Sequence, residues 1–138
     1  MKPSMNKKIT IRSNIANLRF VENAIDEVSS EIGINQDNYG KILVSTLEAV
    51  NNAIVHGNKA EESKNVEIII SFKNNILKIS VLDEGLGFKP KEVPDPTKAE
   101  NIENIRGRGV FLMSRLADKI EFNKRGNMVT MSFKDVRI

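Results

Sequence analysis

Three short stretches decide the fold expected of this chain: EAVNNAIVHG at positions 48–57, DEGLG at 83–87 and RGRG at 106–109. In the first stretch, Glu48 and Asn52 are spaced as i and i+4. On a helix, their carboxylate and amide would therefore share one face. Together, these two groups can hold a water molecule or a hydroxyl group, and a magnesium ion. This stretch predicts a polar site on a helix.

The other two stretches add an acceptor and two pairs of glycines. Asp83, followed by alternating glycines, offers a buried acceptor beside a tight turn. The glycines at 107 and 109 come directly before the apolar run 110–113. There, backbone amides and a helix N-terminus can approach a phosphate chain closely. Each stretch is weak alone, but in this order the three predict an ATP site.

The composition predicts one compact domain spanning residues 1–138. Of the 138 residues, 40% are hydrophobic, which is enough for one core and leaves little room for a second. The absence of cysteine excludes disulfides, thiolate metal ligands and a cysteine nucleophile. No apolar run reaches the length of a signal peptide at the N-terminus, or the ~20 residues of a membrane span anywhere. We therefore expect a cytoplasmic domain that does not enter a membrane.

The charge pattern argues against a nucleic-acid partner. The 21 basic and 18 acidic residues are mixed along the chain, and the net charge is only +3. There is no tryptophan, only one tyrosine, and no zinc-finger spacing. A stacking platform for single strands is therefore unsupported, and the charges are expected to form a solvated surface.

Hydrophobic periodicity predicts the order strand, helix, helix, strand, strand, loop, helix, strand, strand. The strands are expected at 8–12, 66–72, 76–82, 120–122 and 128–133. The second and third strands form a hairpin that delivers Asp83 at its far end. The last two strands pair across a turn at 124–127. Together these elements predict a sheet with helices on one face.

Three helices are expected between the strands. Asn14 is the candidate N-cap of the first helix, which ends near Gly33. Asp37 is the candidate cap of the second, and the third is expected at 110–117. The second helix carries the acid and amide pair of the first stretch. Its inner apolar stripe comprises Leu43, Leu47, Val50 and Ile54.

Between the second and third stretches the sequence loses its periodicity. Residues 88–105 contain three of the four prolines and form the only long loop that the sequence predicts. Long loops in compact domains are usually functional or disordered. Because this one lies between two glycine motifs, we predict a lid over the ligand at approximately 88–106.

The three stretches resemble the N-box and the two glycine boxes of the GHKL superfamily of ATP-binding domains. In this sequence the boxes are 48–57, 83–87 and 107–113. Within the superfamily, nearly the whole chain is similar to the anti-sigma-factor serine kinases of the RsbW and SpoIIAB type. The resemblance implies the Bergerat fold, a two-layer α+β sandwich whose mixed, mostly antiparallel sheet carries helices on one face. It also implies ATP and Mg²⁺ as cofactors.

Three residues carry the chemistry that this resemblance implies. An ionised Asp83 can accept a hydrogen bond from the exocyclic amine of adenine, which favours adenine over guanine. Asn52 offers a neutral carbonyl oxygen to Mg²⁺, which takes only one or two protein ligands. Its neighbour Asn51 is a rival for that role, but the family pattern aligns Asn52. Glu48 would act as the general base on the hydroxyl that attacks the γ-phosphate. The single histidine, His56, is tempting as a phosphoacceptor, but the family pattern places it at the end of the N-box helix.

The glycine boxes would supply further cofactor contacts. Gly107 and Gly109 would offer backbone amides to the phosphates. Gly85 and Gly87 would shape the adenine pocket and the hinge of the lid, because side chains would obstruct the ligand there.

Four other residues complete the predicted site. Either Arg106 or Arg108 could offset charge that develops on the γ-phosphate, and the sequence does not choose between them. Smaller or apolar residues are common where Arg108 stands, so it could face a partner instead. Val110 lies within the second glycine box, directly after its glycines, and Thr130 falls where the superfamily keeps a hydroxyl near the base.

Two functions of different classes follow from the resemblance. The first is a serine/threonine protein kinase that phosphorylates an anti-anti-sigma protein of the STAS type and so controls the release of a sigma factor. The second is a non-catalytic module that sequesters its partner in an ATP-dependent way. The presence of Glu48 favours the kinase. The catalytic domain of a histidine kinase is a weaker third option. A homodimer is expected because members of the family commonly dimerise.

Overall fold

The computed structural model describes residues 4–85 and 105–138, and these form one sheet with helices on one face. The strands are β1 (Met5–Arg12), β2 (Asn65–Lys73), β3 (Ile76–Leu82), β4 (Lys119–Phe122) and β5 (Met128–Lys134). The α-helices are α1 (Leu18–Ile32), α2 (Gln36–Asn52) and α3 (Ile105–Leu116). The predicted order of elements is therefore confirmed. The predicted lid at 88–106 lies almost entirely outside the described residues.

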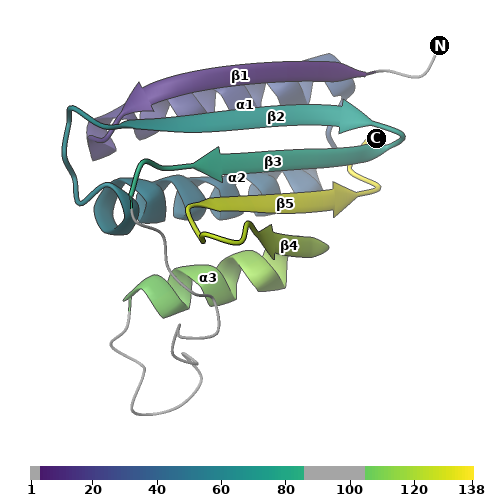
Figure 1. Ribbon diagram of the computed structural model, residues 1–138. Helices are drawn as coiled ribbons and strands as arrows, with labels where there is room; N and C mark the ends of the chain where they lie inside the picture. Colours follow the sequence, from purple (N-terminus) through teal and green to yellow (C-terminus); the bar gives the residue numbers. More distant parts are fainter. Residues whose placement is uncertain (1–3, 86–104) are drawn as a thin grey trace.

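The sheet has the strand order β1-β2-β3-β5-β4 (Figure 1). All four pairings between neighbouring strands of the described chain are antiparallel, so the expectation of a mixed sheet is wrong. Two of these pairings have a local reason, because β2 and β3, and likewise β4 and β5, are joined by short turns that reverse the chain. In the β2–β3 turn, Asn74 and Asn75 adopt φ values of 54° and 64°, as a tight hairpin turn requires.

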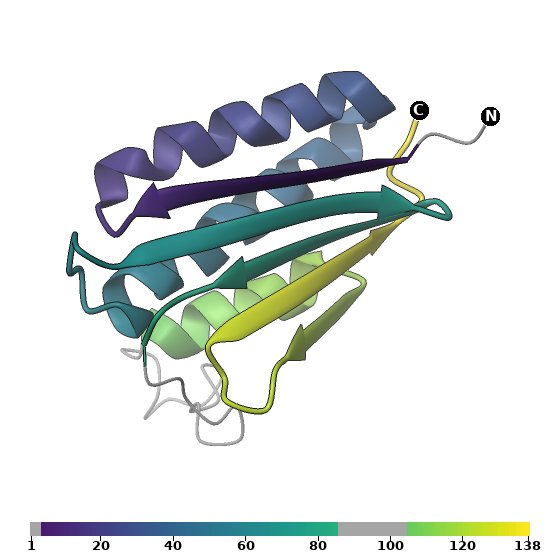
Figure 2. The same ribbon diagram turned by 45° about the horizontal axis from the view of Figure 1, so that its top comes forward.

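The helices form a single layer against one face of the sheet (Figures 1 and 2). Alternation along β2 directs Val66, Ile68, Ile70 and Phe72 into this layer, and all four are buried. The apolar stripe of α1 meets them with Val21, Ile25 and Val28, which are fully buried. Full burial of one such side chain stabilises the fold by about 1.5–3 kcal/mol. The core therefore fixes which face of α1 is turned toward the sheet.

The helix ends follow the sequence with two corrections. Asn14 does cap a helical turn, but this is a short 3₁₀ turn (Ile15–Asn17) that leads into α1. Gly33 ends α1 with a φ of 70°, as predicted. The N-cap of α2 is Asn35 and not Asp37. The Oδ1 of Asn35 accepts a hydrogen bond from the backbone N–H of Asn38 at 2.9 Å. Asp37 lies instead in the first turn, where its charge complements the helix dipole.

Two further expectations about the helices change. In the stripe of α2, Val50 and Ile54 are fully buried, but Leu43 and Leu47 are only half-buried and Ile42 takes their place in the core. Ile54 itself lies in a π-helical turn (Ala53–Gly57) that extends α2. Helix α3 begins at Ile105, so the second glycine box lies inside the helix and not ahead of it. A glycine within a helix allows a neighbouring helix to approach closely, and α3 packs beside α2.

Candidate functional site

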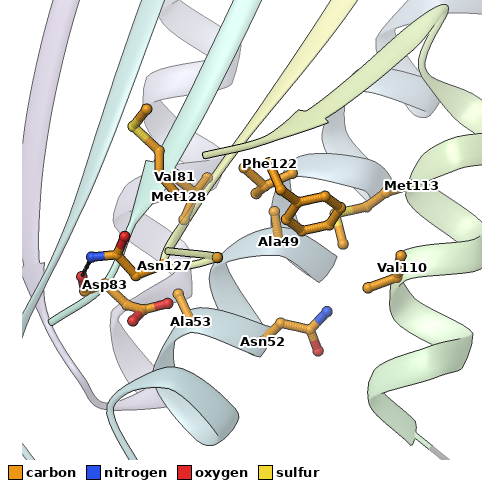
Figure 3. A pocket seen from close by; sticks show the side chains of 12 residues that line it. Ala49, Asn52, Ala53, Val81, Asp83, Val110, Met113, Phe122, Asn127 and Met128 are labelled. Carbon is orange, nitrogen blue, oxygen red and sulfur yellow. Dashed lines mark hydrogen bonds between the residues drawn. The ribbon is translucent and has the colours of Figure 1, made fainter. Parts of the chain in front are cut away.

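A pocket opens where the C-terminal end of α2 meets α3 and the ends of β3 and β5 (Figure 3). Most of its wall is apolar, and the polar side chains come from Asn52, Asp83 and Asn127. The full lining is Ala49, Asn52, Ala53, Val81, Asp83, Val110, Met113, Phe122, Gly126, Asn127, Met128 and Val129. An apolar pocket with a few convergent polar groups is the usual form of a small-molecule site.

Close contacts at three glycines bring the three sequence stretches together. A Cβ atom on Gly57 would overlap the Asp83 carboxylate, and one on Gly85 would overlap the Gly57 carbonyl oxygen. A Cβ atom on Gly109 would lie 2.8 Å from Asn52 Nδ2 and 3.2 Å from Glu48 Oε2. Only glycine allows the chain to approach so closely at these points. The structure therefore assembles the three stretches into one site.

Asn52 is the most unusual residue of this pocket. Only 7% of its surface is exposed, yet within the described part of the chain neither Oδ1 nor Nδ2 has a hydrogen-bond partner. Its side chain points from α2 into the gap toward Val110 of α3 (Figure 3). A buried amide without partners costs about 1–3 kcal/mol, so such groups are rare and usually have a functional reason. Among the described residues, this amide is therefore available to hydrogen-bond a ligand.

Glu48 lies one helical turn before Asn52 on α2 and is half-buried. The position of Gly109 places the Glu48 carboxylate and the Asn52 amide against the same short segment of α3. The predicted acid and amide therefore lie on one face of α2, with Asn52 in the wall of the pocket and Glu48 one turn before it. A carboxylate there can accept a proton, and an amide oxygen there can bind a hard cation.

Asp83 lies at the opposite end of the pocket, just after β3, and is 7% exposed. Its Oδ1 accepts from the backbone N–H of Gly85 at 2.8 Å. Its own backbone N–H donates to the Asn127 carbonyl at 2.9 Å, and the Asn127 side chain donates to the Asp83 carbonyl at 3.2 Å (Figure 3). This end of the pocket therefore has a fixed geometry before any ligand arrives.

A second asparagine, Asn58, is hydrogen-bonded to the segment that follows β3 and carries Asp83. This role was not predicted from the sequence. It is fully buried, and its Oδ1 accepts from the backbone N–H of Glu84 at 2.7 Å. Its Nδ2 donates to Ser13 Oγ at 2.8 Å and to the Asn65 carbonyl at 2.9 Å. Its partners are 7 to 45 residues away in the sequence, so no local pattern reveals this role.

The structure corrects the placement of Thr130. This residue alternates with the pocket residue Val129 along β5, so it faces the side of the sheet that carries no helices. Its hydroxyl is hydrogen-bonded to Ser80 Oγ of β3 at 2.8 Å. The expectation of a Thr130 hydroxyl near the base is therefore wrong. Asn127 and Met128, at the start of β5, line the pocket instead.

The remaining predicted residues divide into two groups. Val110 lines the pocket, as expected, and Gly107 lies in the first turn of α3. Gly87 and the side chains of Arg106 and Arg108 lie outside the described residues. Their roles remain predictions.

The donors and acceptors that are present fit Mg²⁺ and ATP. The amide oxygen of Asn52, which has no partner among the described residues, suits a cation that needs few protein ligands. Because Gly109 has no side chain, there is room beside this oxygen. The buried carboxylate of Asp83 suits the amino group of a base. This protein has one layer of helices on an antiparallel sheet, an acceptor at one end of the pocket, and an acid and an amide toward the other. This arrangement is that of the GHKL class of ATP-binding domains.

Comparison with known proteins establishes the family. The family model described as "Histidine kinase-like ATPase domain" matches residues 11–133, so the chain belongs to that family. The predicted superfamily is thereby confirmed. None of the helices within the described ranges is both long and apolar enough to cross a membrane.

Several characterised relatives share this domain. The "Anti-sigma F factor" of Bacillus licheniformis is 28% identical over 132 residues, which cover 94% of this chain and 89% of that protein. The "Serine-protein kinase RsbW" of Oceanobacillus iheyensis is 27% identical over 112 residues, or 76% of this chain and 71% of that protein. The "Anti-sigma F factor" of Clostridium perfringens strain SM101 is 34% identical over 91 residues, or 64% of this chain and 65% of that protein.

A solved structure supports the fold. The structure of the RsbU and RsbW domains of Rv1364c from Mycobacterium tuberculosis matches 96% of this chain with a TM-score of 0.63 and 20% identity. This chain spans 33% of that longer chain. The match shows a shared architecture and nothing finer.

Proposed function

We propose that this protein is an ATP-dependent serine/threonine protein kinase that acts as an anti-sigma factor in the cytoplasm. Its substrate would be an anti-anti-sigma protein of the STAS type, and its second partner a sigma factor. The observation that carries the proposal is the buried amide of Asn52, which has no partner in the described part of the chain and lies with Glu48 against Gly109. The relatives named as anti-sigma factors and as a serine-protein kinase support the same function.

Each end of the pocket would have its own task. Asp83 would accept a hydrogen bond from the amino group of adenine, held in place by the bonds to Gly85 and Asn127. At the other end, Asn52 would hold Mg²⁺ through its amide oxygen, and Gly109 would leave room for the phosphates. The bound nucleotide supplies the phosphoryl group that is transferred.

Glu48 would serve as the general base. Its carboxylate would orient the hydroxyl of the partner's serine and accept the proton that this hydroxyl loses. Arg106 or Arg108, at the start of α3, would offset charge on the phosphates. We further propose that the protein works as a homodimer.

Transfer of label from γ-labelled ATP tests this proposal. The wild type, Glu48→Gln and a control, Glu31→Gln on the exposed surface of α1, are added to native lysate at equal concentration with Mg²⁺. We expect a small protein to be labelled by the wild type and the control. With Glu48→Gln, labelling should fall at least about 100-fold, because a general base contributes that much, while ATP affinity stays nearly unchanged.

The opposite result would identify a different function. If the wild type binds ATP but gives no label that depends on Glu48, the kinase assignment is wrong. The protein would then be a nucleotide-dependent module that sequesters its partner without transferring a phosphoryl group.

A further inference from the structure

The turn between β4 and β5 (residues 123–127) is hydrogen-bonded to the segment that carries Asp83. Three hydrogen bonds cross from one to the other. Two of them are described above: the Asp83 N–H donates to the Asn127 carbonyl, and the Asn127 side chain donates to the Asp83 carbonyl. In the third, Arg125 Nη2 donates to the carbonyl oxygen of Gly85 at 3.0 Å. This third bond is the only one of the three that involves a charged donor, so it is expected to be the strongest.

The turn that carries Arg125 has a fixed shape. Asn123 Oδ1 accepts from the backbone N–H groups of Gly126 at 2.8 Å and Met128 at 3.1 Å. Asn123 Nδ2 also donates to Asn127 Oδ1 at 2.6 Å. Gly126 has a φ of 80°, which a glycine adopts without strain. The base of the Arg125 side chain is therefore held in one place relative to the pocket.

Arg125 reaches Asp83 through Gly85. The N–H of Gly85 donates to Asp83 Oδ1, while its carbonyl accepts from Arg125. Glycine has the most freely rotating backbone of all residues. Without the hydrogen bond from Arg125, the Gly85 peptide could therefore rotate, and its N–H would no longer hold the Asp83 carboxylate in one orientation. An added Cβ would strike Gly57, so no other residue could stiffen this position.

We propose that Arg125 is a positioning residue for base recognition: by holding the carbonyl of Gly85, it fixes the orientation in which Asp83 meets the amino group of adenine. The inference rests on the proposed binding of ATP, and it assigns to the β4–β5 turn a role in the choice of base. Its neighbour Lys124 is also exposed and carries the same charge. Lys124 is therefore a matched control for the loss of one positive charge from this turn.

The experiment compares two nucleotides that differ by a single amino group. The wild type, Arg125→Ala and Lys124→Ala are titrated with Mg-ATP and with the Mg complex of purine riboside triphosphate, which lacks the exocyclic amine. We expect the wild type and Lys124→Ala to prefer ATP. In Arg125→Ala, ATP affinity should fall about tenfold, the effect of losing a hydrogen bond that involves a charged group. Affinity for the purine riboside triphosphate should stay unchanged.

A merely structural role would give a different result. If Arg125→Ala weakens both nucleotides equally, or weakens neither, the proposal is overturned. Arg125→Lys, which keeps the charge and a donor, should recover most of the preference for ATP, and its failure to do so with an intact fold would also count against the proposal. If the wild type binds neither nucleotide, the proposed function itself fails and this inference falls with it. Thermal unfolding of each variant shows whether the fold is intact.

Discussion

Asn52 and Asn58 are two buried asparagines six residues apart in the sequence, and their surroundings are opposite. Asn58 uses both ends of its amide, with three hydrogen bonds to Glu84, Ser13 and Asn65. Asn52 uses neither end within the described residues. Burial of an amide is tolerated when its hydrogen bonds are made and is costly when they are not. The fold alone explains Asn58, whereas among the described residues the amide of Asn52 has no partner, which is what our proposed ligand would supply.

The same contrast separates the two ends of the pocket. At the Asp83 end, peptide and side-chain groups are tied to Gly85, Asn127 and Asn58 before any ligand binds. At the Asn52 end, both polar atoms of the Asn52 side chain are buried and have no hydrogen-bond partner among the described residues. We infer that the base end is preorganised for recognition, whereas the phosphate end becomes fully hydrogen-bonded only when nucleotide and metal are present. This is a trade of stability for function.

The largest expected effect is on stability at Asn58. Asn58→Ala leaves the Glu84 N–H and the Asn65 carbonyl without their partner, and should lower the free energy of unfolding by about 3 kcal/mol. Urea denaturation measures this loss. Asn23→Ala, on the exposed surface of α1, is the control and should change stability by no more than about 0.5 kcal/mol. Equal stability of the two variants would show that the Asn58 network does not support the fold.

A somewhat smaller effect is expected on ATP binding at Asp83. Asp83→Asn keeps an oxygen that can accept from Gly85 but removes the charge, and should weaken ATP binding by about 2 kcal/mol, or about thirtyfold. Calorimetric titration measures the affinity. Asp135→Asn, at an exposed position after β5, removes the same charge elsewhere and should bind ATP like the wild type. Unchanged affinity in Asp83→Asn would rule out its assignment to the base.

At Asn52 the sign of the stability change should reverse. Asn52→Leu replaces two polar atoms, which have no partner among the described residues, by apolar ones of similar size, and should raise the free energy of unfolding by about 1 kcal/mol. The same variant should lose the part of its ATP affinity that depends on Mg²⁺. A fall in stability, or an unchanged effect of Mg²⁺ on ATP affinity, would contradict the difference between Asn52 and Asn58.

The smallest effect concerns a polar pair outside the pocket. The hydroxyl of Tyr39 on α2 donates to Asp26 of α1. The hydrogen bond to Asp26, followed by burial and the nearby negative charges, raises the pKa of Tyr39 from 10.0 to about 12. Since the protonated hydroxyl is the donor, its contribution is complete below pH 10 and is lost as the pH rises through about 12.

Tyr39→Phe tests this contribution. At pH 8 the variant should be less stable than the wild type by no more than about 1 kcal/mol, and it should bind ATP normally. The difference should shrink as the pH rises from about 10 to about 12. A stability difference that is constant over this range, in urea denaturation, would exclude the hydroxyl bond as its source.

The fold was predictable from the sequence because its main signals are local. Alternation in 66–72 and 76–82 and the asparagines between them predicted the β2–β3 hairpin, which the structure confirms with β2 one residue longer at each end and β3 as predicted. The N-cap of α2 was misassigned because Asn35 and Asp37 are both good caps by residue type. The start of α3 was placed too late because Gly107 and Gly109 suggest a break in a helix. Here they lie within it, and Gly109 lies against α2.

The site was predictable only in part. Glu48, Asn52 and Asp83 could be proposed because they belong to short motifs with fixed spacing, and the structure brings these motifs close together. Thr130 was misplaced because a shift of one residue along a strand reverses the face to which a side chain points. Asn58 and Arg125 act on a loop that is distant from them in the sequence, so only the folded chain reveals them.

The most direct test of this account follows the side-chain amides of Asn52 and Asn58 by NMR in isotope-labelled protein, assigned with the Asn52→Leu and Asn58→Ala variants. ATP is added first, and Mg²⁺ afterwards. We predict that the Asn52 amide resonances move on addition of nucleotide, and again on addition of Mg²⁺, whereas those of Asn58 stay nearly in place. Binding of ATP without any response of Asn52, or no spectral change at all, would contradict the account.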